Sequence, residues 1–172
     1  MFIKFLTAIL IIFIFITPAY SLSISFGYGG QYFYSKNVAA AGYPREYHLE
    51  MPLGNSSFGR LSYINFNYFG QLNGIRLSYE KAILGKEDDS VYSLRLGVFY
   101  TCYWGNPVLA IKNDYVDQLP DSYHEVGISL RPAIFRYGDY FATLLDTYVG
   151  IDPLNRTKIN YGVSFFTLGC LL

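Results

Sequence analysis

The sequence is poor in the residue types that most often cross-link a fold or carry catalysis. It has two cysteines and two histidines in 172 residues, and charged residues make up only 15% of the chain. Two cysteines are too few for a disulfide scaffold, and ordinary soluble domains carry about 25% charged residues. Thirteen basic and thirteen acidic residues cancel, so net charge gives no reason to expect a nucleic-acid partner. No phosphate-binding loop, zinc spacing or nucleophile elbow is present, and no cofactor or metal is expected.

A single long apolar run stands at the beginning of the chain. Lys4 precedes the uninterrupted segment Ala8–Ile16, and Pro18 is followed by Ala19-Tyr20-Ser21. A basic residue, an apolar core and small residues at the cleavage positions are typical of a secretory signal peptide. The sequence therefore predicts a signal peptide over residues 1–21 and one mature domain over residues 22–172. No later segment approaches the roughly 20 apolar residues of a spanning helix.

The predicted mature domain is dominated by alternation of apolar and polar residues, which is typical of β-strands. Eight candidate strands follow one another, and no helical segment separates them. Their apolar faces include Ile24 and Phe26, Leu49 and Met51, Ile64, Phe66 and Tyr68, Leu77 and Tyr79, Leu96 and Val98, Ile128 and Ile134, Leu145 and Val149, and Tyr161 and Phe165. An even number of consecutive antiparallel strands predicts an all-β fold, a closed up-and-down barrel of eight strands.

Three turn or break signals accompany the strands. Asn73-Gly74 predicts a tight hairpin, because both residue types tolerate positive φ. Tyr137-Gly138-Asp139 predicts a second tight turn. Pro132 lies within the sixth candidate strand and predicts a bulge or local break, because proline cannot donate to the ladder.

Alternation alone does not tell whether the apolar face points outward into lipid or inward, as in a soluble calyx that binds an apolar ligand. The polar face is rich in Ser, Gly, Asn and Gln, which suits a narrow lumen, whereas a water-exposed exterior would carry more Lys and Glu. Apolar faces on nearly every strand would overfill an interior of eight strands. Aromatic residues also cluster near strand ends, as in the girdles of membrane barrels: Tyr32, Tyr34, Tyr43, Tyr68, Tyr79, Tyr100, Tyr103 and Trp104. These features favour a transmembrane barrel in contact with outer-membrane lipids.

The chain resembles the small eight-stranded outer-membrane barrels of Gram-negative bacteria, of the OmpA transmembrane-domain and OmpX type. The resemblance lies in the architecture of the whole mature chain. The closing segment Asn160–Phe166 resembles the C-terminal signal that the barrel-assembly machinery reads, although the chain ends in Leu171-Leu172 where an aromatic residue is usual. The resemblance implies an outer-membrane location and assembly by that machinery. With the first strand starting on the periplasmic side, the external connections are residues 35–43, 70–74, 105–122 and 151–157.

The polar face predicts a network of charged side chains in the lumen, formed by Glu46, His48, Glu50, Arg76, Glu80, Arg95, Glu125, Arg131 and Asp146. Glu46, His48 and Glu50 share one strand face and have the residue types of a metal or acid–base site. Five carboxylates nevertheless face three arginines and one histidine, and buried charges persist when they are paired. We therefore expect a salt-bridge network that plugs the lumen, because eight strands leave an interior that side chains just fill.

Two further features bear on function. Asp121, Ser122 and His124 are close in sequence near the predicted external rim and could belong to a lipid A-modifying enzyme, although Asp-Ser is also an ordinary turn ending. Cys102 and Cys170 are predicted at opposite ends of the barrel, too far apart to pair, as free thiols. The leading interpretation is a non-enzymatic outer-membrane barrel that acts in surface interaction or envelope structure through its external loops. The alternatives are the lipid A-modifying enzyme and the secreted soluble calyx.

Overall fold

The computed structural model describes residues 22–35, 38–66, 72–84, 93–105, 108–112, 115–118, 122–154 and 159–172. The predicted signal peptide, residues 1–21, lies outside the described residues. Within the described ranges, no helix is long and apolar enough to cross a membrane.

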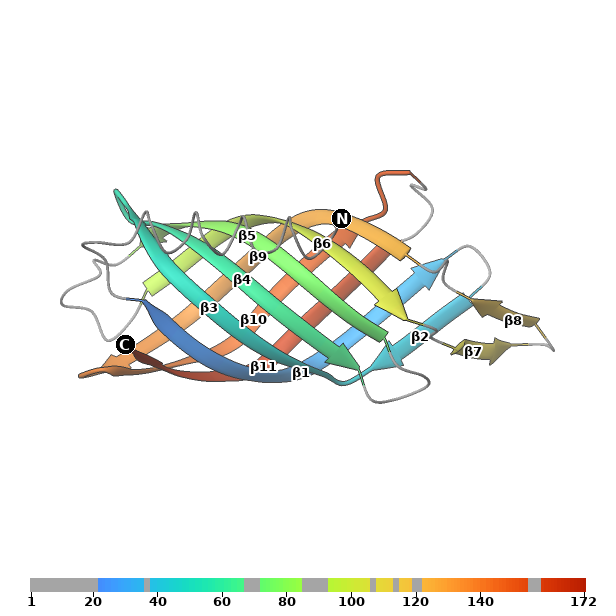
Figure 1. Ribbon diagram of the computed structural model, residues 1–172, viewed down its shortest axis with the longest axis horizontal. Helices are drawn as coiled ribbons and strands as arrows, with labels where there is room; N and C mark the ends of the chain where they lie inside the picture. Colours follow the sequence, from blue (N-terminus) through green and yellow to red (C-terminus); the bar gives the residue numbers. More distant parts are fainter. Residues whose placement is uncertain are drawn as a thin grey trace, which may run out of the picture.

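Eight long antiparallel strands close into a barrel (Figure 1), which confirms the predicted fold class. The sheet order is β11-β10-β9-β6-β5-β4-β3-β1, and pairing of β1 with β11 closes the ring. At 10 to 16 residues, the strands reach or exceed the roughly 9–11 residues that a tilted strand needs to cross a bilayer. Their bounds are β1 Ser23–Ser35, β3 Pro44–Gly54, β4 Ser57–Phe66, β5 Leu72–Leu84, β6 Ser93–Gly105, β9 Ser122–Tyr137, β10 Tyr140–Ile151 and β11 Ile159–Leu171.

Three short strands lie together at one end of the barrel (Figure 1). β2 (Val38–Gly42) pairs with the second half of β1, and β7 (Val108–Lys112) pairs with β8 (Tyr115–Gln118) in a separate two-stranded sheet. β2 and β7 contact each other. The predicted external connections 35–43 and 105–122 thus contain regular hairpin structure. Residues 72–74 of the predicted connection 70–74 belong to β5.

Polar residues point into the barrel and apolar residues point outward along most strands, as the alternation predicts. In β5, for example, Leu77 and Tyr79 are exposed on the outer surface, and Arg76 and Glu80 are buried inside. Because each side chain on a strand faces the opposite side from its neighbour, the same ring of backbone carries an apolar exterior and a polar interior.

The face predicted for the third strand is wrong. Ile64 and Phe66 are 0% and 3% exposed and lie in the lumen, whereas Tyr63 is 41% exposed on the outer surface. β4 begins at Ser57, and its inward positions include Arg60 and Ile64. Apolar residues near one end of the barrel occupy the interior here. Hydrophobicity alone therefore predicted the wrong face of this strand to point outward. Tyr68 lies outside the described residues.

The predicted Asn73-Gly74 hairpin is also wrong, because both residues lie within β5 and pair with β6. Gly74 serves a packing role: a Cβ atom there would lie 2.7 Å from Cδ1 of Tyr103. The tight turn at the opposite end joins β3 to β4 instead, where Asn55 and Ser56 have φ values of 51° and 58°. The turn predicted at Tyr137-Gly138-Asp139 is confirmed between β9 and β10.

The irregularity predicted at Pro132 is confirmed. The register between β6 and β9 shifts, so that Ser93 faces Ile134 whereas Arg95 faces Arg131. The extra residue on β9 inverts the alternation, and Ile134 is buried in the lumen rather than on the predicted apolar exterior. A bulge of this kind adds one unpaired residue and changes the face of the residues beyond it.

A second interruption accounts for the weak alternation of the seventh predicted strand. Leu145 in β10 has φ = 56°, and both Leu144 and Leu145 are exposed on the outer surface. Asp146 therefore returns to the lumen, as predicted, after two consecutive outward residues.

Candidate functional site: the barrel lumen

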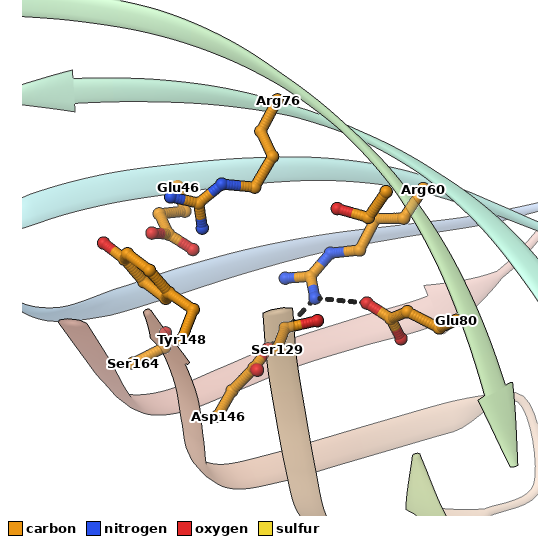
Figure 2. Close-up of a pocket in the computed structure, with 9 residues that line it drawn as sticks. Glu46, Arg60, Arg76, Glu80, Ser129, Asp146, Tyr148 and Ser164 are labelled. Carbon is orange, nitrogen blue, oxygen red and sulfur yellow. Dashed lines mark hydrogen bonds and ion pairs between the residues drawn. The ribbon is translucent and has the colours of Figure 1, made fainter. Parts of the chain in front are cut away.

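The interior of the barrel concentrates the charged side chains of the described chain. All nine residues of the predicted network point inward, and each is at most 9% exposed. They come from β3, β5, β6, β9 and β10. Figure 2 shows several of them around the centre of the lumen. The nine residues are Glu46, His48, Glu50, Arg76, Glu80, Arg95, Glu125, Arg131 and Asp146.

Arg131 is the centre of the main ion cluster because it reaches three carboxylates. Its Nη1 donates to Glu50 at 2.9 Å, its Nη2 to Glu80 at 3.2 Å and its Nε to Asp146 at 3.3 Å. Arg95 donates to the other oxygen of Glu50 at 2.7 Å. The cluster connects β3, β5, β6, β9 and β10 through side chains that are held by more than one bond.

Arg60 of β4 belongs to the same cluster and was missed by the sequence analysis. Its Nη1 lies 3.0 Å from Asp146 and 3.3 Å from Glu80. Its Nη2 lies within 3.0 Å of both ring nitrogens of His48. Arg60 shares a face of β4 with Ile64 and Phe66, the face predicted to point outward, so alternation extended back along the strand would have placed it outside. With Arg60, four arginines rather than three face the five carboxylates.

Arg76 lies in a different environment. Its guanidinium is packed between the rings of Phe99 and Tyr148, 4.4 and 3.9 Å from their centroids. Its Nε donates to Thr101 at 3.0 Å, and its Nη2 donates to Tyr103 at 3.3 Å. This cation is thus held by aromatic faces and hydroxyl groups, an arrangement that stabilises a desolvated arginine.

A second hydrogen-bonded group completes the polar interior beside Arg76. Asn160 donates to Glu125 at 2.7 Å, and Gln31 donates to the hydroxyl of Tyr103 at 2.9 Å. Tyr103 is fully buried and therefore is not part of the aromatic girdle in which it was predicted. Its ring instead stacks on Tyr123 inside the lumen, with 5.6 Å between centroids.

Apolar side chains close the polar interior at both ends. Toward the end that carries β2, β7 and β8, the buried residues are Ile64, Phe66, Leu72, Tyr103 and Tyr123; toward the other end they are Phe58 and Ile134. Arg95 packs over the ring of Phe58, 3.3 Å from its centroid. A cavity of about 10 Å³ lies at the centre between these ends, room for about one water molecule. The described lumen is a packed core rather than a channel.

The arrangement around His48 differs from that of a metal site. His48 lies 3.6 Å from Glu46, but Glu50 is turned toward Arg95 and Arg131. Nδ1 of His48 is 2.9 Å from the hydroxyl of Ser62. Among the described residues, no group of three or more metal-ligating side chains is assembled.

The predicted rim group is not brought together by the described residues. Asp121 lies outside them, and Ser122 is the first residue of β9. The imidazole of His124 stacks on Tyr100 on the outer surface, with Nδ1 at 2.6 Å from the tyrosine hydroxyl. His124 therefore faces away from the lumen and from its buried carboxylates.

The outer surface carries a row of aromatic side chains that crosses neighbouring strands. Ring centroids are 5.3 Å apart for Phe26 and Tyr47, 6.3 Å for Tyr47 and Tyr63, and 6.5 Å for Tyr63 and Trp104. Trp104 was a predicted member of the aromatic girdle. A band of aromatic side chains on the outer surface of a barrel is typical of a membrane–water interface.

The two cysteines are free thiols near opposite ends of the barrel. Cys102 pairs in register with Ile75 and His124, and Cys170 pairs with Ile24 and Tyr140.

The closed ring, the plugged lumen and the apolar exterior can be compared with known proteins. Neisserial surface protein A superposes with a TM-score of 0.68 at 10% identity, over 88% of this chain and 98% of that chain. This chain has the fold of the small outer-membrane barrels. The N-terminal barrel domain of Pseudomonas aeruginosa OprF superposes with a TM-score of 0.57 at 12% identity, over 87% of this chain and 97% of that domain. No family model and no curated protein sequence matches the chain.

Proposed function

We propose that this chain is a non-enzymatic integral protein of the Gram-negative outer membrane that contacts its surroundings through external loops and passes no solute. The observation that carries the proposal is the distribution of side chains around a closed ring of strands. Val98, Ile128 and Leu130 are among the large apolar residues exposed outside, whereas Glu50 and Arg131 are paired inside. In hydrocarbon, strands can cross only when every backbone group is paired, as in a closed barrel. A soluble calyx would need the opposite distribution.

The structural neighbours support the same class of function. One is a neisserial surface protein and the other is the N-terminal barrel domain of OprF. The hairpin β7–β8 extends the end of the barrel that also carries β2 (Figure 1), and long connections on the external side of such barrels are the usual sites of interaction. We assign this end to the cell surface.

The location can be tested by membrane fractionation and by electrophoresis of unheated and heated samples. A folded membrane barrel in detergent migrates differently before and after boiling and appears in the outer-membrane fraction. A protein that stays monomeric and soluble without detergent would contradict the proposal.

The orientation and the plug require separate measurements. A protease site inserted at positions 113–114, between β7 and β8, should be cleaved on intact cells. The matched insertion at Asn55-Ser56, in the turn at the opposite end, should be cleaved only after the outer membrane is permeabilised. The purified barrel should give no conductance steps in planar bilayers, because ionic and aromatic side chains fill its lumen.

A further inference from the structure

We infer that the outer wall of the barrel binds the phosphorylated sugar headgroup of lipid A at the end that carries β2, β7 and β8. The site is centred on Arg45, the second residue of β3, whose side chain is exposed on the outer surface. β3 directly follows β2 along the chain, so Arg45 lies at this end of the barrel (Figure 1). The inference rests on the proposed function, because it requires this end to reach the outer leaflet of the outer membrane.

The wall of the barrel provides no counterion for Arg45. No ion pair within the described part of the chain includes its guanidinium group. The other exposed cations of the long strands, Lys81 and Arg136, lie near the turns at the opposite end. A charge on the lipid side of a membrane protein is unfavourable unless its side chain reaches the headgroups, so Arg45 needs an anion from the membrane. The carboxylates of the eight long strands all lie in the lumen: Glu46, Glu50, Glu80, Glu125 and Asp146.

Four tyrosine rings surround Arg45 on the outer surface. Tyr28 lies opposite Arg45 in the register of β1 and β3, and its ring stacks on Tyr43 with 6.3 Å between centroids. Tyr47 follows Arg45 by two residues, and its ring centroid lies 6.3 Å from that of Tyr63. Tyrosine has an apolar ring and a polar tip, and it is enriched at the headgroup level of membranes. The four rings therefore place Arg45 at the depth of lipid phosphates.

Two amides extend the site along the barrel wall. Asn65 lies directly opposite Arg45 in the register of β3 and β4, and its Nδ2 donates to Oδ1 of Asn73 at 2.7 Å. The hydroxyl of Tyr63 donates to the same oxygen at 2.8 Å. These bonds use a donor of Asn65 and the acceptor of Asn73, which leaves an acceptor on the first side chain and a donor on the second. Both side chains are partly exposed, so the remaining groups can bind sugar hydroxyls.

The width of the site favours lipid A over a phospholipid. Arg45, Asn65 and Asn73 lie in register on the three neighbouring strands β3, β4 and β5. Neighbouring strands are about 4.8 Å apart, so the three residues span roughly 10 Å. The headgroup of lipid A is a phosphorylated disaccharide, which can reach both ends of this span, whereas a phospholipid offers a single phosphate with a small headgroup. Arginine binds phosphate through parallel N–H donors, and the amides bind the sugar.

The test is native mass spectrometry of the full-length barrel in dodecyl maltoside micelles, titrated with lipid A and, separately, with phosphatidylglycerol. The wild type should bind one lipid A molecule at least tenfold more tightly than phosphatidylglycerol. Arg45→Gln should weaken lipid A binding about tenfold or more, the usual effect of losing a hydrogen bond to a charged group. Lys81→Gln removes a matched exposed cation at the opposite end and should leave lipid A binding unchanged.

Asn73→Ala separates binding of the sugar from binding of the phosphate. It should weaken lipid A binding and leave phosphatidylglycerol binding unchanged, because only the disaccharide reaches this side chain. Equal affinity of the wild type for the two lipids, or equal effects of Arg45→Gln and Lys81→Gln, would overturn the inference. Failure of the proposed function would be detected separately, by fractionation and protease cleavage, because the titration in detergent depends on neither location nor orientation.

Discussion

The side chain of Glu125 on β9 crosses directly over Gly150 on β10 to reach Asn160 on β11. Asn160 donates to the carboxylate at 2.7 Å and faces Gly150 in the strand register. A Cβ atom at position 150 would collide with Oε1, Cδ and Cγ of Glu125. Glycine at position 150 therefore permits a hydrogen bond between side chains on two strands that are not adjacent in the sheet.

Gly150→Ala should lower the free energy of unfolding by about 1–3 kcal/mol, the usual effect of overpacking a tight interior. Denaturant titration of the barrel in lipid vesicles would measure the change. The control is Gly30→Ala, where the nearest atom to the added methyl group would be Cζ of Phe165 at 3.5 Å. Equal effects at the two glycines would contradict the role given to the crossing of Glu125.

Arg131→Met should destabilise the barrel by about 3–5 kcal/mol, because it leaves buried carboxylates without a principal cation. The affected groups are Glu50, Glu80 and Asp146. The matched control is Arg45→Met, at an exposed position on the outside of β3. The same denaturant titration applies, and a loss below 1 kcal/mol for Arg131→Met would show that the cluster contributes little to stability.

Val98→Arg tests which face contacts lipid. Val98 is 56% exposed near the middle of β6, and an arginine on the lipid face near the midplane destabilises a barrel by about 2–4 kcal/mol. Leu154→Arg, at a residue 88% exposed in the connection after β10, should have almost no effect. Refolding into vesicles should show this difference. Tolerance of arginine at position 98 would argue against burial of this surface in a bilayer.

Ser56→Gly should stabilise the turn between β3 and β4. Ser56 adopts φ = 58°, a left-handed conformation that costs a non-glycine residue roughly 1–2 kcal/mol. The free energy of unfolding should rise by up to that amount. Ser57→Gly, one residue later in β4, should lower it, because the hydroxyl of Ser57 lies 2.8 Å from that of Tyr79. Stabilisation by both substitutions would point to a general effect of glycine in this segment.

Strand alternation was sufficient to predict the barrel class and the inward side of most strands. In β5, strict alternation of Arg76, Ser78 and Glu80 with apolar residues required no knowledge of the neighbours. The same reasoning failed where apolar residues line both ends of the lumen, as at Ile64 and Phe66. It also failed beyond the bulge near Pro132, because one extra residue inverts every face that follows.

The residue types predicted most of the side chains that lie in the lumen, but not which of them pair with one another. Arg60 was omitted because it shares a strand face with Ile64 and Phe66, which were predicted to point outward, and Tyr103 was placed outside because tyrosine is common at membrane interfaces. Gly74 was taken as a turn residue, whereas it makes room for the ring of Tyr103. Each error concerns a contact between strands, which the spacing along a single strand does not contain.

The order of residues alone determined an even set of strands, one apolar face and one polar face, since these follow from the period of two in an extended chain. The register and the bulges decided how β1 closes on β11, which groups bind each arginine, and which aromatic side chains cover the ends of the lumen. These features depend on which residues meet across the ring, and only the assembled barrel brings Glu50, Arg131 and Asp146 within bonding distance.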